Sequence, residues 1–271
     1  NYSAIVKLGT HHLLLRPRES YELRIESFSL KSTPTAKIFW HRDVEDNSVA
    51  VATFETPTQQ LLIESELIIQ HYNESPLNFI VSDYAINYPF KYLANDNFIL
   101  SSYMVLPNEE TRLLLNNWIY NIYKYGEKIQ TYTLLQKLIT YIFKNFTYKV
   151  REEAGVQTAK QTLSYGSGSC RDFAFLFMEV VKCLGLATRF VSGYLYAPLM
   201  SDKVGSTHAW AEVYLPGGGW IGFDPTTGNI AGTDHISVAV SRLPDNVPPI
   251  AGSFLGVSDS TISVGVWVTK V

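Results

Sequence analysis

The chain has little cysteine: among its 271 residues there are two, Cys170 and Cys183. They lie thirteen positions apart with a helical pattern between them. In a helix this spacing separates them by roughly 20 Å, far beyond the reach of a disulfide. No disulfide is therefore expected, and two isolated thiols without a CxxC pair do not make a zinc site.

Long apolar runs and a strong charge imbalance are also absent. No apolar run reaches about 18 residues, so we expect no membrane-spanning helix. The formal net charge of −3 is too close to neutral to indicate nucleic acid or an anionic membrane surface as a partner. The lack of a disulfide fits a reducing compartment, so we expect a cytoplasmic location, although a first residue of Asn1 leaves a removed signal peptide open.

What the chain does have is 46% hydrophobic residues, enough for a sizeable core. Its first part, residues 1–105, reads as short strands with turn signals between them. Extended runs cover Ala36–Trp40 and Ser48–Phe54, and polar residues join them. This pattern predicts a β-sandwich-like N-terminal domain. Nothing in it resembles a chemical cluster, and His11 and His12 are interpreted as strand residues rather than ligands.

From Pro107 the pattern becomes helical, and residues 106–271 are predicted to form a second, α+β domain. Asn108 and two acids open a first helix that ends near Gly126. A second helix is expected within residues 131–150 and a short third one over Val156–Leu163. A strongly apolar helix starts at Cys170, and an antiparallel meander follows it.

Cys170 lies at the junction "GSGSCRDFAFLF" (residues 166–177), where flexible residues lead into this apolar helix. A helix N-terminus favours a thiolate and lowers the pKa of a thiol below its free value of about 8.5. The backbone N–H of Cys170 is also well placed to donate to a developing oxyanion. The alternative is a loop-to-helix entry that happens to contain a thiol. Cys183, near the end of the same helix, is interpreted as an inert apolar filler.

His208 and Asp224 belong to a predicted hairpin that turns at "PGGG" (residues 216–219). Alternation puts His208 on the same strand face as Trp210. If the turn centres near Gly217, Asp224 lies close to His208 across the pair, where its carboxylate would orient the imidazole. Taken singly, a strand histidine or an aspartate before proline is usually structural. The three residues Cys170, His208 and Asp224 together favour nucleophilic catalysis.

Two stretches carry a family resemblance, "GSGSCRDFAFLFMEVVKCLGLATRFVSGYL" and "THAWAEVYLPGGGWIGFDPTTG". They resemble the transglutaminase-like core of bacterial proteins in the transglutaminase/papain-like superfamily. The tail "DHISVAVSRLPDNVPPIAGSFLG" and the upstream "YPFKYL" resemble the same bacterial subgroup, in which a β-rich N-terminal region precedes the core. The resemblance implies a papain-like α+β core, with a central cysteine-bearing helix and an antiparallel sheet. It also implies a triad of Cys170 as nucleophile, His208 as base and Asp224 as the residue that orients it.

The reaction implied by the resemblance is acyl transfer from a peptide or protein amide through a thioester. Attack by water would make the protein a cysteine protease or amidase, the preferred hypothesis, whereas attack by an amine would make it a transglutaminase. A third hypothesis is a non-catalytic binding module that retains the motifs. No cofactor is expected. Animal transglutaminases use calcium, but this sequence contains no EF-hand-like loop, so no metal is expected either. The sequence does not indicate an oligomeric state.

Several supporting residues are predicted with less specific patterns. Tyr165, just before the glycine stretch, is a candidate second oxyanion donor. Arg171 and Asp172 either pair and complement the helix dipole or order the loop around Cys170. Phe173 is interpreted as core, with a narrowing of the cleft as the alternative. The remaining acids noted are taken as solvated loop residues: Asp202, Asp234 and Asp245.

Overall fold

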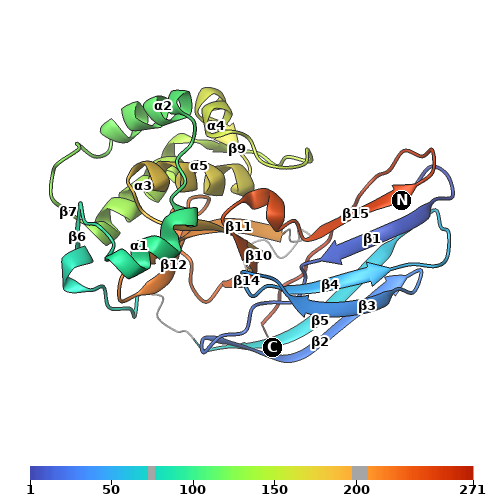
Figure 1. Cartoon of the computed structure of the whole chain (residues 1–271). Helices are drawn as coiled ribbons and strands as arrows, with labels where there is room; N and C mark the ends of the chain where they lie inside the picture. Colours follow the sequence, from blue (N-terminus) through green and yellow to red (C-terminus); the bar gives the residue numbers. More distant parts are fainter. Residues whose placement is uncertain (73–76, 197–206, 271) are drawn as a thin grey trace.

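The computed structural model describes residues 1–72, 77–196 and 207–270, so the predicted loop acid Asp202 lies outside the described residues. A core of helices packed on a sheet lies beside a β-rich part (Figure 1). The described helices are α1 (Ala94–Leu100), α2 (Glu109–Tyr120), α3 (Thr131–Asn145), α4 (Ala159–Tyr165) and α5 (Cys170–Cys183). Among the described residues no helix is long and apolar enough to cross a membrane.

A five-stranded antiparallel sheet forms the floor of the core, in the order β13-β12-β11-β10-β14. Its strands are β10 (Thr188–Leu195), β11 (Thr207–Leu215), β12 (Gly219–Asp224), β13 (Asn229–Ile230) and β14 (His235–Ser241). Helix α5 packs on β10 and β11, and α2, α3 and α4 contact α5 in turn. Because neighbours surround α5, nearly all of its side chains are buried, which explains its continuous apolar sequence.

All four predicted helices are present, and two of them, α2 and α4, have shifted ends. Helix α2 ends at Tyr120, well before Gly126, which adopts a positive φ in a later turn. Helix α4 begins at Ala159 rather than Val156, because Thr158 caps it by accepting a hydrogen bond from the N–H of Gln161. Helix α5 begins at Cys170 as predicted.

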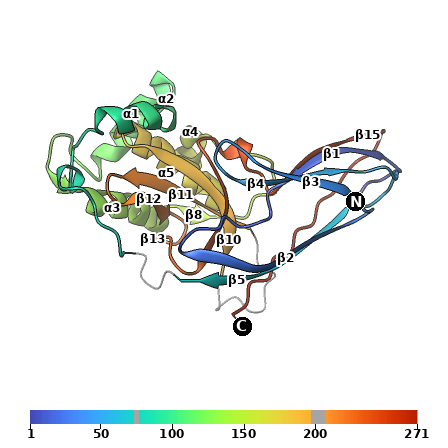
Figure 2. The ribbon, with the colours of Figure 1, turned by 60° about the horizontal axis from the view of Figure 1, so that its bottom comes forward.

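The β-rich part consists of two layers, which Figure 2 shows from the side. A small apolar core lies between them. One layer is a four-stranded sheet in the order β15-β1-β4-β3, and the other is the ribbon of β2 and β5. Their bounds are β1 (Lys7–Leu13), β2 (Leu23–Thr33), β3 (Lys37–Arg42), β4 (Ser48–Thr53), β5 (Leu62–His71) and β15 (Ile250–Leu255). His11 and His12 both lie within β1, as expected.

Two segments pack with the part of the molecule on the other side of the boundary predicted at residue 105. Strand β15, from the far end of the chain, pairs with β1, for example Ile250 opposite Leu13. The segment around α1 instead joins the helical core, where the Tyr88 hydroxyl donates to the carbonyl of Leu184. Both contacts join segments that are far apart in the sequence, which a local sequence pattern does not reveal.

Short elements complete the described fold. They are β6 (Asn87–Tyr88), β7 (Ile129–Gln130), β8 (Thr147–Tyr148) and β9 (Ser167–Gly168), with 3-10 turns η1 (Asp83–Ala85), η2 (Ser101–Tyr103) and η4 (Pro244–Asn246). The parallel pair β8 and β9 matters most for the site, because β9 directly precedes Cys170 and thereby places Tyr148 beside the start of α5.

Candidate active site

Cys170 is the first residue of α5, and its side chain is buried at 8% exposure. Ser169 precedes the helix, and its backbone N–H and hydroxyl donate to the same oxygen of Asp172, over 2.8 and 2.9 Å. This local cap makes Cys170 the first residue of the helix. The thiol is therefore held at the positive end of the helix, as the sequence predicts.

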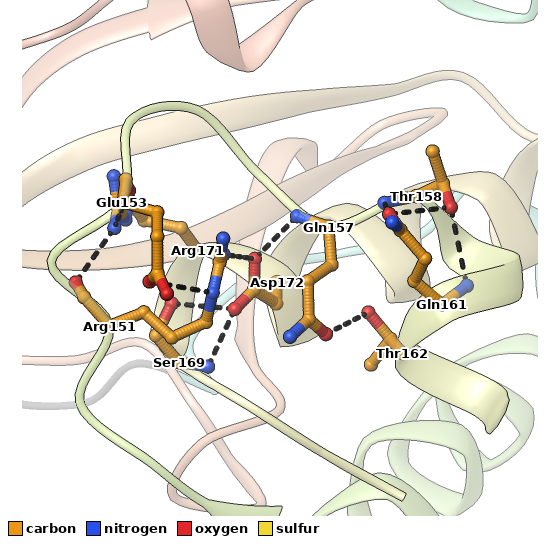
Figure 3. A network of polar contacts seen from close by, with 9 residues as sticks. All are labelled: Arg151, Glu153, Gln157, Thr158, Gln161, Thr162, Ser169, Arg171 and Asp172. Atoms are coloured by element: carbon orange, nitrogen blue, oxygen red, sulfur yellow. Dashed lines mark hydrogen bonds and ion pairs between the residues drawn. The ribbon is translucent and has the colours of Figure 1, made fainter. Parts of the chain in front are cut away.

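A polar network around Asp172 ties the preceding loop to the start of α5 (Figure 3). Oδ1 of Asp172, the oxygen that Ser169 does not contact, accepts hydrogen bonds from the guanidinium of Arg151 and from the backbone N–H of Gln157, each at 2.7 Å. Burial raises the pKa of this carboxyl, but the hydrogen bonds from Gln157, Ser169 and Arg151 outweigh it and lower the pKa overall. Asp172 is thus a buried anion with a donor on every side.

Arg171 extends this network to the same loop. Its guanidinium donates to the backbone carbonyls of Arg151 and Glu153, both at 3.1 Å. It does not pair with Asp172, whose ionic partner is Arg151. Of the two predicted roles for Arg171 and Asp172, ordering of the loop before Cys170 agrees with these contacts, and Asp172 also serves the helix N-terminus.

His208 and Asp224 meet across the hairpin of β11 and β12. The pairing places Ala211 opposite Phe223, with the turn around Gly217 in its positive-φ conformation, which is the register predicted from the sequence. The Nε2 atom of His208 lies 2.8 Å from Oδ2 of Asp224. Both side chains are buried.

The His208 ring also interacts with the Cys170 thiol. Because Nε2 contacts Asp224, the ring nitrogen left for the thiol is Nδ1. Burial lowers the pKa of His208, but the interactions with Asp224 and Cys170 outweigh it and raise the pKa to about 10. Burial likewise raises the pKa of Asp224, whereas its contacts with His208 and His235 bring that pKa far below its usual value.

Tyr148 is a neighbour of Cys170 that sequence reasoning missed. Partial burial and then its interaction with Cys170 raise the pKa of the Tyr148 hydroxyl to about 12, although 47% of the residue is exposed. The tyrosine ring packs edge-on against Phe173, 6.4 Å between centroids. Tyr165, the predicted oxyanion donor, instead ends α4 with 62% of its surface exposed. Of the two tyrosines, Tyr148 is thus the one that interacts with Cys170.

His235 is a second missed residue, from the stretch "DHISVAV" that carried only a family resemblance. Its Nε2 lies 3.1 Å from the Asp224 oxygen that His208 contacts. Trp210 packs beside both histidines, stacked with His208 and edge-on to His235. Ligand atoms of His208, Asp224 and His235 all lie within 4.8 Å of one another, a spacing that could hold a metal ion. Hydrogen bonds between the two histidines and Oδ2 of Asp224 already provide these side chains with polar partners.

Two sequence interpretations agree with the surroundings of the site. Cys183 lies at the end of α5, where burial and then the charge of Glu179 raise its thiol pKa to about 11, as suits an inert residue. Both cysteines are free. Phe173 is 2% exposed and packs against Phe146 and Tyr148, so it belongs to the core.

Two family models match the chain. The model of the transglutaminase-like superfamily matches residues 118–225, which contain Cys170, His208 and Asp224. The model of the bacterial transglutaminase-like N-terminal region matches residues 1–70. The chain belongs to the transglutaminase-like superfamily. The fold agrees with this assignment, since the helix-on-sheet core and the β-rich part correspond to the two matched regions.

Solved structures and curated proteins place this transglutaminase-like chain among bacterial relatives. A "putative cysteine protease" of Cytophaga hutchinsonii shares the fold over 99% of this chain and 96% of its own, with a TM-score of 0.68 and 18% identity. Uncharacterized protein ML0607 of Mycobacterium leprae is 36% identical over 109 residues, 38% of each chain. Uncharacterized protein Rv2569c of Mycobacterium tuberculosis is 31% identical over 138 residues, 48% of this chain and 44% of its own. The match thus spans less than half of each curated relative.

Proposed function

We propose that this transglutaminase-like protein catalyses cysteine-dependent acyl transfer from peptide or protein amides, with water as the usual acceptor. The observation that carries the proposal is the hydrogen bond from His208 to Asp224, together with the interaction of the His208 ring with Cys170. A thiol at a helix N-terminus, a histidine in contact with it and a buried carboxylate on the far ring nitrogen supply a nucleophile, a base and an orienting group.

The first half-reaction forms the acyl-enzyme. The proton of Cys170 already resides on His208, in keeping with the raised pKa of the imidazole, and the sulfur attacks the amide carbon to form a C–S bond. The carbonyl oxygen becomes an oxyanion, which the Cys170 backbone N–H and the Tyr148 hydroxyl would stabilise. The His208 imidazolium then gives its proton to the amide nitrogen, and the C–N bond breaks.

The second half-reaction releases the acyl group. A water molecule replaces the departed amine, and neutral His208 takes a proton from it as its oxygen attacks the thioester carbon. Collapse of this tetrahedral species breaks the C–S bond and leaves a carboxylic acid. Asp224 stabilises the imidazolium in both halves by accepting from its Nε2–H.

Casein is a suitable general probe, because it presents many peptide bonds and glutamine amides at once. We expect the wild-type chain to release new amino termini from casein and Cys170→Ala to release none. Adding dansylcadaverine to the same reaction measures amine incorporation, so that hydrolysis and transfer are read in parallel. Cys183→Ala is the matched control and should keep the full rate.

The outcomes separate the three hypotheses. Dansyl incorporation that exceeds hydrolysis would replace the hydrolase by a transglutaminase. Equal turnover by the wild type and Cys170→Ala would contradict thiol catalysis altogether. A Cys170 that iodoacetamide alkylates no faster than a free surface thiol, together with no turnover, would favour a binding module that retains the motifs.

A further inference from the structure

Oδ2 of Asp224 contacts two histidines, which come from different strands of the core sheet. His208 Nε2 lies at 2.8 Å and His235 Nε2 at 3.1 Å from this single oxygen. We propose that His235 is a positioning residue, which holds the Asp224 carboxylate in the orientation that His208 needs for acyl transfer. This inference rests on the proposed function and adds a fourth residue to it.

The surroundings of His235 determine which of its nitrogens carries the proton. The backbone N–H of Gly232 points at Nδ1 over 3.2 Å, so Nδ1 is the acceptor and Nε2 carries the hydrogen of the neutral ring. His235 therefore donates to Asp224. A proton on Nδ1 would set two donors against each other at Gly232, so the backbone favours the donating tautomer.

A carboxylate needs such donors because its final torsion has a broad, soft minimum. Asp224 is fully buried, so water does not orient it. Its Oδ1 accepts the backbone N–H of Thr226 at 2.8 Å, and its Oδ2 accepts the hydroxyl of Thr227 at 3.1 Å in addition to the histidines. Among these partners, His235 is the ring that reaches Oδ2 from β14, whereas His208 reaches it from β11.

The position of His235 depends in turn on the β-rich part of the molecule. Strand β14 is an edge strand of the core sheet, and Asn47 pairs with its free edge through two hydrogen bonds to the backbone of Val240, at 2.8 and 2.9 Å. The backbone N–H of Arg18 donates to the carbonyl of Ser237 on the same strand. The N-terminal region therefore helps to hold the strand from which His235 reaches Asp224.

Two substitutions of similar size test the donor itself. His235→Met fills the space without an N–H, whereas His235→Gln places an amide N–H near the lost Nε2. With p-nitrophenyl acetate as the acylating probe, we expect His235→Met to lower kcat roughly 10-fold, as loss of an orienting hydrogen bond does elsewhere. KM should change less than about 2-fold, and His235→Gln should recover most of the rate.

The matched control is His11→Met, which replaces a buried histidine in β1, outside the core sheet. The His11 ring has a hydrogen bond with the carbonyl of Gly9 in the same strand and packs against Phe54. The substitution should leave kcat unchanged, whatever it does to stability. Equal kcat in His235→Met and wild type, a loss that His235→Gln does not recover, or a rise of KM alone would each overturn the proposal. If Cys170→Ala loses acylation while His235→Met keeps the wild-type kcat, the positioning role of His235 is wrong and the proposed function still stands.

A measurement on the unmodified chain covers the case in which His235→Met does not fold. Long-range ¹H–¹⁵N NMR spectra of the histidine rings report which nitrogen carries the proton. A neutral His235 protonated at Nε2 is the expected result. Protonation at Nδ1 would leave Nε2 unable to donate to Asp224, and the proposal would be wrong.

Discussion

Replacement of Asp172 by asparagine removes the charge at the centre of the network before Cys170. Asp172 has no exposed surface, and its ionic partner Arg151 lies 2.7 Å away with 17% of its side chain exposed. The NH₂ group of an asparagine would replace one of the two carboxylate oxygens. It would then face hydrogen-bond donors, either those of Ser169 or those of Arg151 and Gln157. Breaking a buried pair costs about 3–5 kcal/mol. At about 2–4 °C per kcal/mol for a chain of this size class, Tm should fall by roughly 6–20 °C.

The matched control changes the other carboxylate that Arg151 contacts. Glu153 lies 3.5 Å from the Arg151 guanidinium but is 74% exposed, so Glu153→Gln should cost less than about 1 kcal/mol. Differential scanning calorimetry at pH 7 compares the two variants. A Tm for Asp172→Asn no lower than that for Glu153→Gln would refute the buried-anion reasoning.

The pH dependence provides a second check of the same variant. Since the folded state lowers the pKa of Asp172, its contribution is fully present above the unfolded value of about 3.9 and is lost as the pH falls through the folded pKa. The Tm difference between wild type and Asp172→Asn should therefore persist at pH 5–7 and shrink below about pH 4. A difference that grows on acidification would contradict the direction of the shift.

Three further predictions concern the reacting groups. Iodoacetamide at pH 7 should label Cys170 at least 100-fold faster than Cys183, since the pKa of Cys183 is raised to about 11; peptide mapping with equal labelling of both would contradict this. Tyr148→Phe keeps the packing on Phe173 and should lower kcat by about 100-fold through loss of one oxyanion donor, measured with p-nitrophenyl acetate; an unchanged kcat would exclude that role. Turnover should fall as the pH rises through about 10, where His208 loses the proton that it gives to the leaving group; a pH–rate profile still rising beyond pH 11 would count against the imidazolium.

The β-rich part has a structural connection to the site that its own sequence does not indicate. It contains no chemical cluster, yet Asn47 binds the edge of β14 and β15 returns to pair with β1. The two parts therefore share strands and contacts rather than a simple linker. A chain that lacks residues 1–105 would lose Asn47, the partner of that edge, along with strands β1 to β5.

The features that the sequence predicts well depend on local interactions. Cys170 opens a helix because Ser169 and Asp172 form a cap within four residues, and His208 faces Asp224 because a glycine turn sets the register of one hairpin. Capping and hairpin register act over a few residues, so their patterns are readable in the chain. The nucleophile, the base and the orienting carboxylate could be predicted for this reason.

The residues that were missed reach the site through pairings between distant segments. Tyr148 arrives through the parallel pair of β8 and β9, and His235 through the antiparallel pair of β14 and β10. Which segments pair is decided by the burial of whole faces, a property of the folded chain rather than of any short stretch. The sequence alone thus determined which residues could react, whereas the tertiary structure decided which side chains orient and assist them.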